Sequence, residues 1–279
     1  MTSKAVLVTG CSTGIGRATA ERLAGRGYTV YATARRPETI ADLEAKGCRT
    51  LALDVTDEAS MVSAVGAVEA EHGAVGALVN NAGYAVERAI ETVPMDEVRR
   101  QFETNYFGLV RMCQLVLPAM RAQGWGRIVN VSSVGGRLTF PGGAHYHATK
   151  HAVEAFSDAL RFETAGFGIR VSIIEPGLIK TAFGDTATAP TITEDGPYAA
   201  FNAAVAKRVA GAYEGLMGKL AAAGPQAVAT VIDRAISSRN PASRYRVTAG
   251  AKMTIATRRL LPDRAWDTMM RMQFPRPKP

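Results

Sequence analysis

The sequence predicts an α/β fold in which a doubly wound parallel sheet forms a single domain. Short apolar, β-branched runs alternate with longer segments of helical period, a pattern typical of strand–helix–strand units. The runs are continuously apolar, which indicates strands covered by helices on both faces. At 279 residues the chain has the length of one compact domain. We expect one domain over residues 1–279, divided into a core (1–181), a loop and helix (182–224), and a C-terminal helix, last strand and basic tail (225–279).

Six strands are expected in the core, with helices between them. The strands are Ala5–Thr9, Thr29–Thr33, Thr50–Leu53, Ala77–Val79, Arg127–Val131 and Arg170–Ile174. The helical stretches are Ile15–Arg26, Ser60–His72, Met95–Arg121 and Ala148–Ala165. The alternation then stops, and the segment Thr181–Gly196, rich in Thr, Ala, Gly and Asp, is expected to be a loop. After it we expect helices at Pro197–Ala223 and Pro225–Ser237 and a late strand at Arg244–Thr248.

The composition excludes several classes of protein. With 47% hydrophobic and 21% charged residues, the chain is neither disordered nor collagen-like. No apolar run reaches the roughly 18 residues that a membrane span needs, and the run Ala5–Val8 is too short for a signal peptide. Three widely spaced cysteines suit neither a disulfide framework nor a zinc site. We expect a soluble, cytoplasmic protein without a bound metal.

The net charge of +8 at first suggests an acidic macromolecular partner, but its distribution weakens that interpretation. Seven of these charges lie in residues 240–279, so the remainder of the chain is nearly neutral. No motif for nucleic-acid binding accompanies them, and we expect no nucleic-acid partner. The segment from Arg258 to Met270 could form an amphipathic surface helix. The tail is thus a solvated surface or, alternatively, a weak contact with a membrane surface or another subunit.

The segment TGCSTGIG joins the first strand to the first helix. Glycines in such a place permit a tight turn and a close approach of backbone to pyrophosphate, and the helix N-terminus supplies N–H donors. This position favours a nucleotide-binding loop of a Rossmann-like sheet over a simple turn. The residues expected to contact the nucleotide are Gly10, Ser12, Thr13, Gly14, Ile15 and Gly16.

The spacing Gly-x-x-x-Gly-x-Gly resembles the glycine loop of the short-chain dehydrogenase/reductase family. Further motifs follow in the family's order between Thr9 and Thr181, nearly two thirds of the chain: Asn80-Asn81-Ala82-Gly83, Asn105, Ser133, Tyr146-x-x-x-Lys150 and Pro176-Gly177. A small departure is Tyr-His-Ala-Thr-Lys at 146–150, where Tyr-x-Ala-Ser-Lys is usual. The resemblance implies an oxidoreductase that uses a nicotinamide cofactor. It also implies a homodimer or homotetramer built from the helices that hold Asn105 and Tyr146.

Tyr146 and Lys150 are four residues apart and therefore share one face of a helix. By itself such a pair is a common packing or surface feature. A carbonyl that accepts hydride must also gain a proton, and a nearby ammonium lowers the pKa of a phenol that would otherwise titrate near 10. The resemblance implies that Tyr146 is the general acid/base, Ser133 orients the carbonyl, and Asn105 holds a relay water. Without the resemblance, Asn105 would be a satisfied polar group in a helix.

The end of the second strand bears on the choice of cofactor. Ala34 stands where NAD-binding relatives tend to have Asp, and Arg35 follows it, so we expect NADP(H) in preference to NAD(H). Alternatively, Arg35 and Arg36 are solvated turn residues, and Thr13 stands where many NADP-preferring relatives have a second basic residue. The resemblance implies further cofactor contacts at Asp54, Val55, Asn81, Ala82, Gly83, Tyr146, Lys150, Pro176, Gly177, Ile179 and Thr181. Asp54 could also be a helix N-cap.

The region after Thr181 is expected to form a helical substrate lid after the sixth strand. Its apolar residues, with Tyr84 and Phe140, suggest a pocket for a hydrophobic secondary alcohol, ketone or aldehyde; alternatively they are the core side of two helices. These residues are Ala182, Phe183, Ala187, Ala189, Pro190, Ile192, Tyr198, Phe201, Val205, Leu216 and Met217. The segments Gly27–Arg35 and Glu175–Phe183 resemble the steroid and retinol dehydrogenase branch. His145 is expected to be at most a wall of this pocket, and neither it nor His147 a catalytic group.

Two other functions remain open. A 3-oxoacyl-acyl-carrier-protein reductase has the same core, but such reductases usually end soon after the late strand. A non-catalytic, cofactor-sensing scaffold typically lacks the tyrosine or the lysine, and both are present here.

Overall fold

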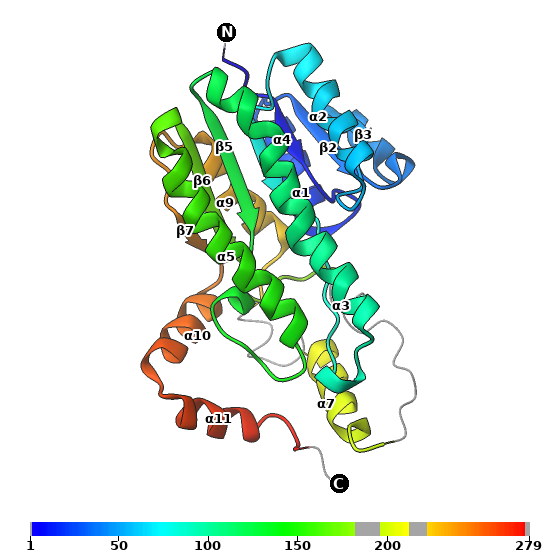
Figure 1. The fold of residues 1–279 in the computed structure, drawn as a ribbon, viewed down its shortest axis with the longest axis vertical. Helices are drawn as coiled ribbons and strands as arrows, with labels where there is room; N and C mark the ends of the chain where they lie inside the picture. The colour runs from blue at the N-terminus through cyan, green and yellow to red at the C-terminus, as the bar shows by residue number, and fades with distance from the viewer. Residues whose placement is uncertain (1, 182–195, 212–221, 277–279) are drawn as a thin grey trace.

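The computed structural model describes residues 2–181, 196–211 and 222–276 (Figure 1). Seven parallel strands form one sheet in the order β3-β2-β1-β4-β5-β6-β7. The order reverses between β1 and β4, as in a doubly wound, Rossmann-like sheet, so the predicted fold class is confirmed. The strands are β1 (Val6–Val8), β2 (Val30–Ala34), β3 (Cys48–Ala52), β4 (Ala77–Asn80), β5 (Gly126–Val131), β6 (Ile169–Glu175) and β7 (Arg244–Arg246).

Helices cover both faces of the sheet, as the continuously apolar strands predict (Figure 1). Alternate strand residues point to opposite faces. Leu7, Leu78 and Ile128 therefore pack toward α2 (Glu58–His72), α4 (Gly108–Ala122) and α5 (Ala144–Thr164). Val6, Val8 and Val79 pack toward α1 (Gly14–Gly25) and α9 (Pro225–Ser237) on the other face. A 3-10 helix over Pro37–Lys46, which the sequence did not predict, leads from β2 to β3.

The predicted helix Met95–Arg121 is interrupted. It consists of α3 (Met95–Phe102), a π-helical segment (Glu103–Phe107) and α4. A π-helical turn is wider than an α-helical turn and is frequent at functional sites. The side chains of all three pieces keep a roughly helical period, which is why the apolar pattern does not reveal the wide turn that contains Asn105.

Two other boundaries differ from the prediction. Helix α5 begins at Ala144, four residues earlier than expected, because the chain turns at Gly142-Gly143 and no side chain caps the helix to mark its start. The basic tail forms two helices, α10 (Ala249–Leu260) and α11 (Asp263–Arg271), whereas the sequence suggested that Arg258 to Met270 could form one. Pro262 separates them, since proline lacks the N–H that a helix interior needs.

A third apolar cluster lies beyond the carboxyl edge of the sheet. Helices α7 (Ala199–Gly211), α10 and α11 lie there, below the sheet in Figure 1. Phe201, Val205, Ile255 and Trp266 are buried in this cluster, and Phe140 packs against it. The other expected lid residues at 182–192 and at 216–217 lie outside the described residues. Within the described part of the chain, none of the helices combines the length and apolarity that crossing a bilayer requires.

Candidate active site

The glycine loop lies at the carboxyl end of β1, next to the loop that follows β4. Gly10 and Gly14 have φ angles of 73° and 60°, which favour glycine. A Cβ on Gly10 would lie 2.9 Å from the Ala82 Cα, and a Cβ on Gly14 would lie 3.1 Å from the Thr181 Cγ2. At these two positions the loop therefore has no room for a side chain.

The N-terminus of α1 is suited to an anion. Thr13 is the N-cap residue but makes no side-chain capping hydrogen bond, and the first turn contains no acidic residue. Uncapped N–H groups at a helix start, with the positive end of the helix dipole, form a phosphate site. Ser12 is exposed beside Thr13, while Ile15 is half-buried against the core. The predicted nucleotide-binding residues thus lie together on one loop.

Asn81 connects this loop to β4. Its Nδ2 donates to the carbonyls of Thr9 (2.9 Å) and Gly10 (3.0 Å). The backbone N–H groups of Asn81 and Ala82 both donate to Thr9 Oγ1 at 3.0 Å. The Asn-Asn-Ala-Gly segment therefore fixes the glycine loop from one side.

Lys150 and Tyr146 lie in the first turns of α5. The Lys150 ammonium is buried, donates to Val131 O at 2.8 Å, and lies 5.8 Å from the centre of the Tyr146 ring. Burial lowers the pKa of Lys150 to about 8, while the nearby Glu154 carboxylate opposes that change. A desolvated ammonium beside a phenol is an arrangement that can tune a proton donor.

Asn105 is held firmly beside this pair. Its Oδ1 accepts from Tyr84 N (3.0 Å), and its Nδ2 donates to Tyr84 O (2.8 Å) and to Thr149 Oγ1 (3.1 Å). A Cβ on Gly83 would lie 3.0 Å from Asn105 Oδ1 and 3.7 Å from Lys150 Nζ. The π-helical turn, the Asn-Asn-Ala-Gly loop and α5 therefore meet at one point.

Ser133 follows β5, and its Oγ accepts from Gly135 N at 3.1 Å. The same turn reaches the segment after β6, because Val134 N donates to Pro176 O at 2.9 Å. Ser132 instead lies against Glu154: a Cβ on Gly136 would be 2.6 Å from Ser132 Oγ and 3.0 Å from Glu154 Cγ. The two serines therefore have different surroundings, and Ser133 belongs to the turn that reaches Pro176.

The remaining predicted cofactor residues lie along the same edge. Arg35 is exposed after β2. Burial raises the pKa of Tyr84, and the positive charges of Arg100 and Arg35 partly oppose that increase. Ile179 forms a parallel bridge with Ala223, while Gly177 lies against the Thr248 side chain. Asp54 is not the N-cap of α2: its Oδ1 accepts from Thr56, and Asp57 caps the helix. Val55 is buried against the start of α4.

Comparison with known proteins identifies the family to which the chain belongs. Residues 4–191 match the model of the short chain dehydrogenase family. The chain belongs to the short-chain dehydrogenase/reductase family. Members of this family are NAD(P)-dependent oxidoreductases.

Individual relatives cover most of the chain. It is 37% identical to the oxidoreductase YusZ of Bacillus subtilis over 98% of this chain and 99% of that protein. It is 40% identical to the 3-ketodihydrosphingosine reductase of Bacteroides thetaiotaomicron, over 69% and 70% respectively. A short-chain dehydrogenase from Streptomyces avermitilis superposes with a TM-score of 0.81 at 35% identity, covering 97% of this chain and 98% of that one. A serine dehydrogenase complexed with NADP+ superposes at 0.76 with 28% identity, covering 88% and 95%.

Within this dehydrogenase, a buried charge network under α5 was missed by sequence reasoning. Glu154 and Glu175 are 4% and 0% exposed. Arg244 Nε lies 3.0 Å from Glu154 Oε2 and 3.3 Å from Glu175 Oε1, and Arg246 Nε lies 3.1 Å from Glu175 Oε2. One signal could have found it: Glu154 is four residues after Lys150, on the same helix face.

His147 is a second residue whose position the sequence did not predict. It is buried between the Ser133 turn and the loop at Phe140, whose N–H donates to His147 Nδ1 at 3.3 Å. Burial lowers its pKa to about 4, and His151 adds to the effect. His147 therefore lies buried and neutral between the Ser133 turn and the loop at Phe140, with its ring next to that of Tyr146.

Proposed function

We propose that this short-chain dehydrogenase transfers hydride between NADP(H) and a hydrophobic secondary alcohol or ketone, or an aldehyde. The observation that carries the proposal is the meeting of Tyr146, Lys150 and Asn105 beside the uncapped N-terminus of α1. This arrangement joins a phosphate-binding loop to a tunable proton donor. A cofactor-sensing scaffold would need the phosphate-binding loop but not the proton donor.

Each residue has a separate role in the proposed reaction. The bound nicotinamide cofactor supplies or accepts the hydride. Ser133 and Tyr146 hydrogen-bond the carbonyl oxygen, and Tyr146 donates its proton when the carbonyl is reduced. Lys150, held by Val131 O, favours the phenolate electrostatically and binds the nicotinamide ribose. Asn105 holds the water that returns a proton, and in the oxidation direction Tyr146 is the base.

The residues present fit a phosphorylated dinucleotide. The bare glycine backbone at Gly10 and Gly14 has no room for side chains, which is what a backbone that approaches pyrophosphate requires. Arg35 and Arg36 are exposed after β2, and neither forms an ion pair within the described part of the chain. Their guanidinium groups are therefore available for a 2′-phosphate. These observations support NADP(H) over NAD(H).

An apolar substrate is supported by the cluster beyond the carboxyl edge. Phe140 packs against Trp266 and His147, with ring centres 6.0 Å apart in both pairs, so aromatic side chains lead from the Tyr146 neighbourhood into the apolar cluster. The relative named 3-ketodihydrosphingosine reductase acts on a lipid-like ketone by its name. We extend that preference to this chain, together with the steroid and retinol dehydrogenase branch suggested by its motifs.

A substrate panel tests the proposal. Purified protein is incubated with steroid, retinoid and long-chain ketones, 3-oxoacyl thioesters and short ketones, and oxidation of NADPH or NADH is followed by absorbance. Turnover of bulky apolar ketones with NADPH is expected. Preference for 3-oxoacyl thioesters on a carrier protein would replace the proposal with the acyl-carrier-protein reductase. Tight NADPH binding without turnover of any class would favour a cofactor-sensing scaffold.

We also propose self-association through α4 and α5. Phe107, before α4, is 50% exposed, and Phe162 on α5 is 85% exposed. Large apolar side chains at a shared surface are typical of subunit interfaces. Light scattering should give the mass of a dimer or tetramer, and Phe162→Glu should shift it to that of the monomer. An unchanged mass for the variant would place the interface elsewhere.

A further inference from the structure

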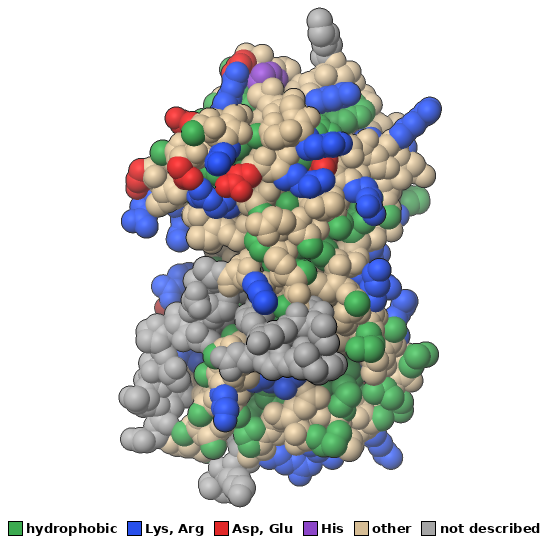
Figure 2. Space-filling view, turned by 180° about the vertical axis from the view of Figure 1, so that it is seen from behind, with side chains coloured by type: hydrophobic (Ala, Val, Ile, Leu, Met, Phe, Trp, Pro, Cys, Tyr) green, Lys and Arg blue, Asp and Glu red, His purple; other side chains and the backbone are tan. Residues whose placement is uncertain are grey.

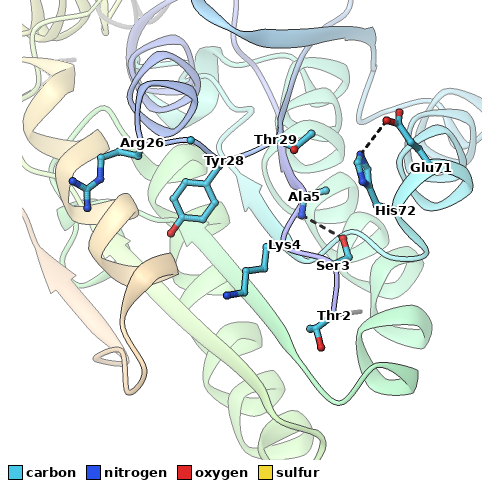
Figure 3. Close-up of a pocket in the computed structure, with 10 residues that line it drawn as sticks. Thr2, Ser3, Lys4, Ala5, Arg26, Tyr28, Thr29, Glu71 and His72 are labelled. Atoms are coloured by element: carbon cyan, nitrogen blue, oxygen red, sulfur yellow. Dashed lines mark hydrogen bonds and ion pairs between the residues drawn. The ribbon is translucent and has the colours of Figure 1, made fainter.

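Two adjoining hollows lie at the amino end of the sheet, at the opposite edge from the active site. They have volumes of about 790 Å³ and about 220 Å³ and share Lys4 and Tyr28. Figure 3 shows Lys4 before β1 and Tyr28 before β2, with their side chains pointing into the space between them. The smaller hollow is also lined by Arg127 at the start of β5 and by Arg239 after α9.

Arg127 is a buried cation that has no carboxylate partner among the described residues. It is 6% exposed, and its guanidinium stacks on the Trp125 ring at 4.9 Å. Its terminal nitrogens donate to the carbonyls of Gly126 (3.0 Å) and Ser238 (3.2 Å), while its Nε is buried without a hydrogen-bond partner. A buried charge without an opposite charge is costly. An anion in the smaller hollow would remove that cost.

The surroundings of Arg127 are positive as well. Within residues 2–181, 196–211 and 222–276, none of Lys4, Arg127 and Arg239 forms an ion pair. The nearby acidic groups already have partners: Asp233 binds Arg22 and Arg26, and Glu71 at the rim of the larger hollow binds Arg49. Burial lowers the pKa of Arg127, and the positive charge of Arg170 lowers it further. Figure 2 shows Lys and Arg side chains on the upper part of the molecule, with Asp and Glu side chains among them.

Neutral donors complete the lining. Ser237 and Ser238 end α9 at the smaller hollow, and burial raises the pKa of Tyr28, so its hydroxyl remains a proton-bearing donor at neutral pH. Three unpaired cations with hydroxyl donors around a hollow suit a phosphate group, which accepts several charge-assisted hydrogen bonds at once.

We propose that the smaller hollow binds the phosphate group of a small soluble ligand through Lys4, Arg127 and Arg239, with the larger hollow holding the rest of that ligand. The site is separate from the cofactor loop, because it lies at the amino ends of β1, β2 and β5 while the cofactor loop lies at the carboxyl end of β1. No contact of the catalytic residues depends on it.

The test measures binding of inorganic phosphate and glycerol 3-phosphate by calorimetry and by the shift of Tm, at constant ionic strength set with chloride. The wild-type protein should bind both probes. The double variant Lys4→Ala/Arg239→Ala, which alters exposed side chains and should fold normally, should bind them at least about tenfold more weakly, because each lost charge-assisted hydrogen bond weakens binding to about that extent. Arg127→Met should lose the phosphate-induced shift in Tm.

Two control variants separate this site from other phosphate sites. Arg35→Ala, at the cofactor edge, should keep the phosphate-induced shift in Tm, and Arg99→Ala, an exposed arginine on α3, should keep it too. Loss of the shift in Arg35→Ala with retention in the double variant would assign the phosphate to the cofactor loop and overturn the proposal. A wild-type response to phosphate no larger than the response to chloride would also overturn it.

Discussion

The Arg244 guanidinium on β7 donates to the Glu154 carboxylate on α5 at 3.0 Å, one helical turn after Lys150. The same guanidinium is 3.3 Å from Glu175, which directly precedes Pro176-Gly177. One arginine from the basic C-terminal region therefore joins the helix that carries Tyr146 to the strand that leads into the expected nicotinamide-binding segment. Burial raises the pKa of Glu154, and Arg244 counteracts that increase.

Replacing Arg244 should destabilise the protein strongly. Arg244→Met leaves Glu154 and Glu175 buried with fewer positive partners, and breaking a buried pair in this way costs about 3–5 kcal/mol of unfolding free energy. Urea unfolding measures the change. Arg244→Lys should restore part of it, and Arg99→Met, whose partner Asp96 is exposed, should cost less than about 1 kcal/mol. Equal losses in Arg244→Met and Arg99→Met would contradict the prediction.

Tyr146→Phe should abolish turnover and leave cofactor binding largely intact. The variant keeps the ring but lacks the proton donor, and general acid catalysis contributes about 10²–10⁴-fold to a rate. Turnover is measured with a substrate found in the panel, and NADPH binding by fluorescence. Tyr106→Phe is the matched control, because Tyr106 packs against Phe107 and Phe156. Turnover by Tyr146→Phe at the wild-type rate would disprove the proposed mechanism.

Arg35→Ala should weaken the binding of NADPH and leave the binding of NADH unchanged. A lost charge-assisted hydrogen bond of about 1.5–3 kcal/mol corresponds to a rise of about 10- to 100-fold in the dissociation constant for NADPH. Titration of both cofactors against the wild type, Arg35→Ala and Arg36→Ala measures the effect. If the wild-type protein binds NADH more tightly than NADPH, the preference for NADP(H) is wrong.

The burial of His147 predicts a stability that falls on acidification. The pKa of His147 is about 4 in the folded protein, whereas an unfolded histidine has a pKa near 6.5. Between these values the unfolded state binds the extra proton, so the unfolding free energy should decrease as the pH falls from about 6.5 to 4, by up to about 3 kcal/mol. Urea unfolding at several pH values should show a weaker dependence for His147→Asn than for the wild type.

The outer face of α10 should bind anionic membranes weakly. Met253 and Leu260 are 64% and 83% exposed on α10, next to the exposed Lys252 and Arg259, and such amphipathic basic faces bind anionic lipid surfaces. Sedimentation with phosphatidylglycerol vesicles at low salt should recover the protein, and high salt or Leu260→Ser should release it. Ile90→Ser removes an apolar side chain that is as exposed as Met253, at 64%, from outside α10 and should have no effect. No sedimentation at low salt would leave α10 as a solvated surface.

Local sequence patterns predict most of the strands and helices to within one or two residues. The strands β1, β2 and β5 and the helices α1, α2 and α9 show this, because apolar period and glycine position are local properties. The π-helical turn at Asn105 and the early start of α5 were missed, because neither produces a local signal. Both are fixed by contacts with distant residues: Tyr84 and Thr149 hold Asn105, and His147 packs against the loop before α5.

The sequence by itself determined the family, the fold class and the set of candidate site residues, since motif spacing and apolar period follow from residue identity alone. The tertiary structure decided which charged side chains pair with one another. The tail that accounts for most of the net charge of +8 contributes Arg244 and Arg246 to a buried network with Glu154 and Glu175. The nearly neutral body, in contrast, keeps Arg127 buried without a carboxylate partner in the described structure. Net charge is a sum over the chain, whereas pairing depends on which side chains the fold brings within a few ångströms of one another.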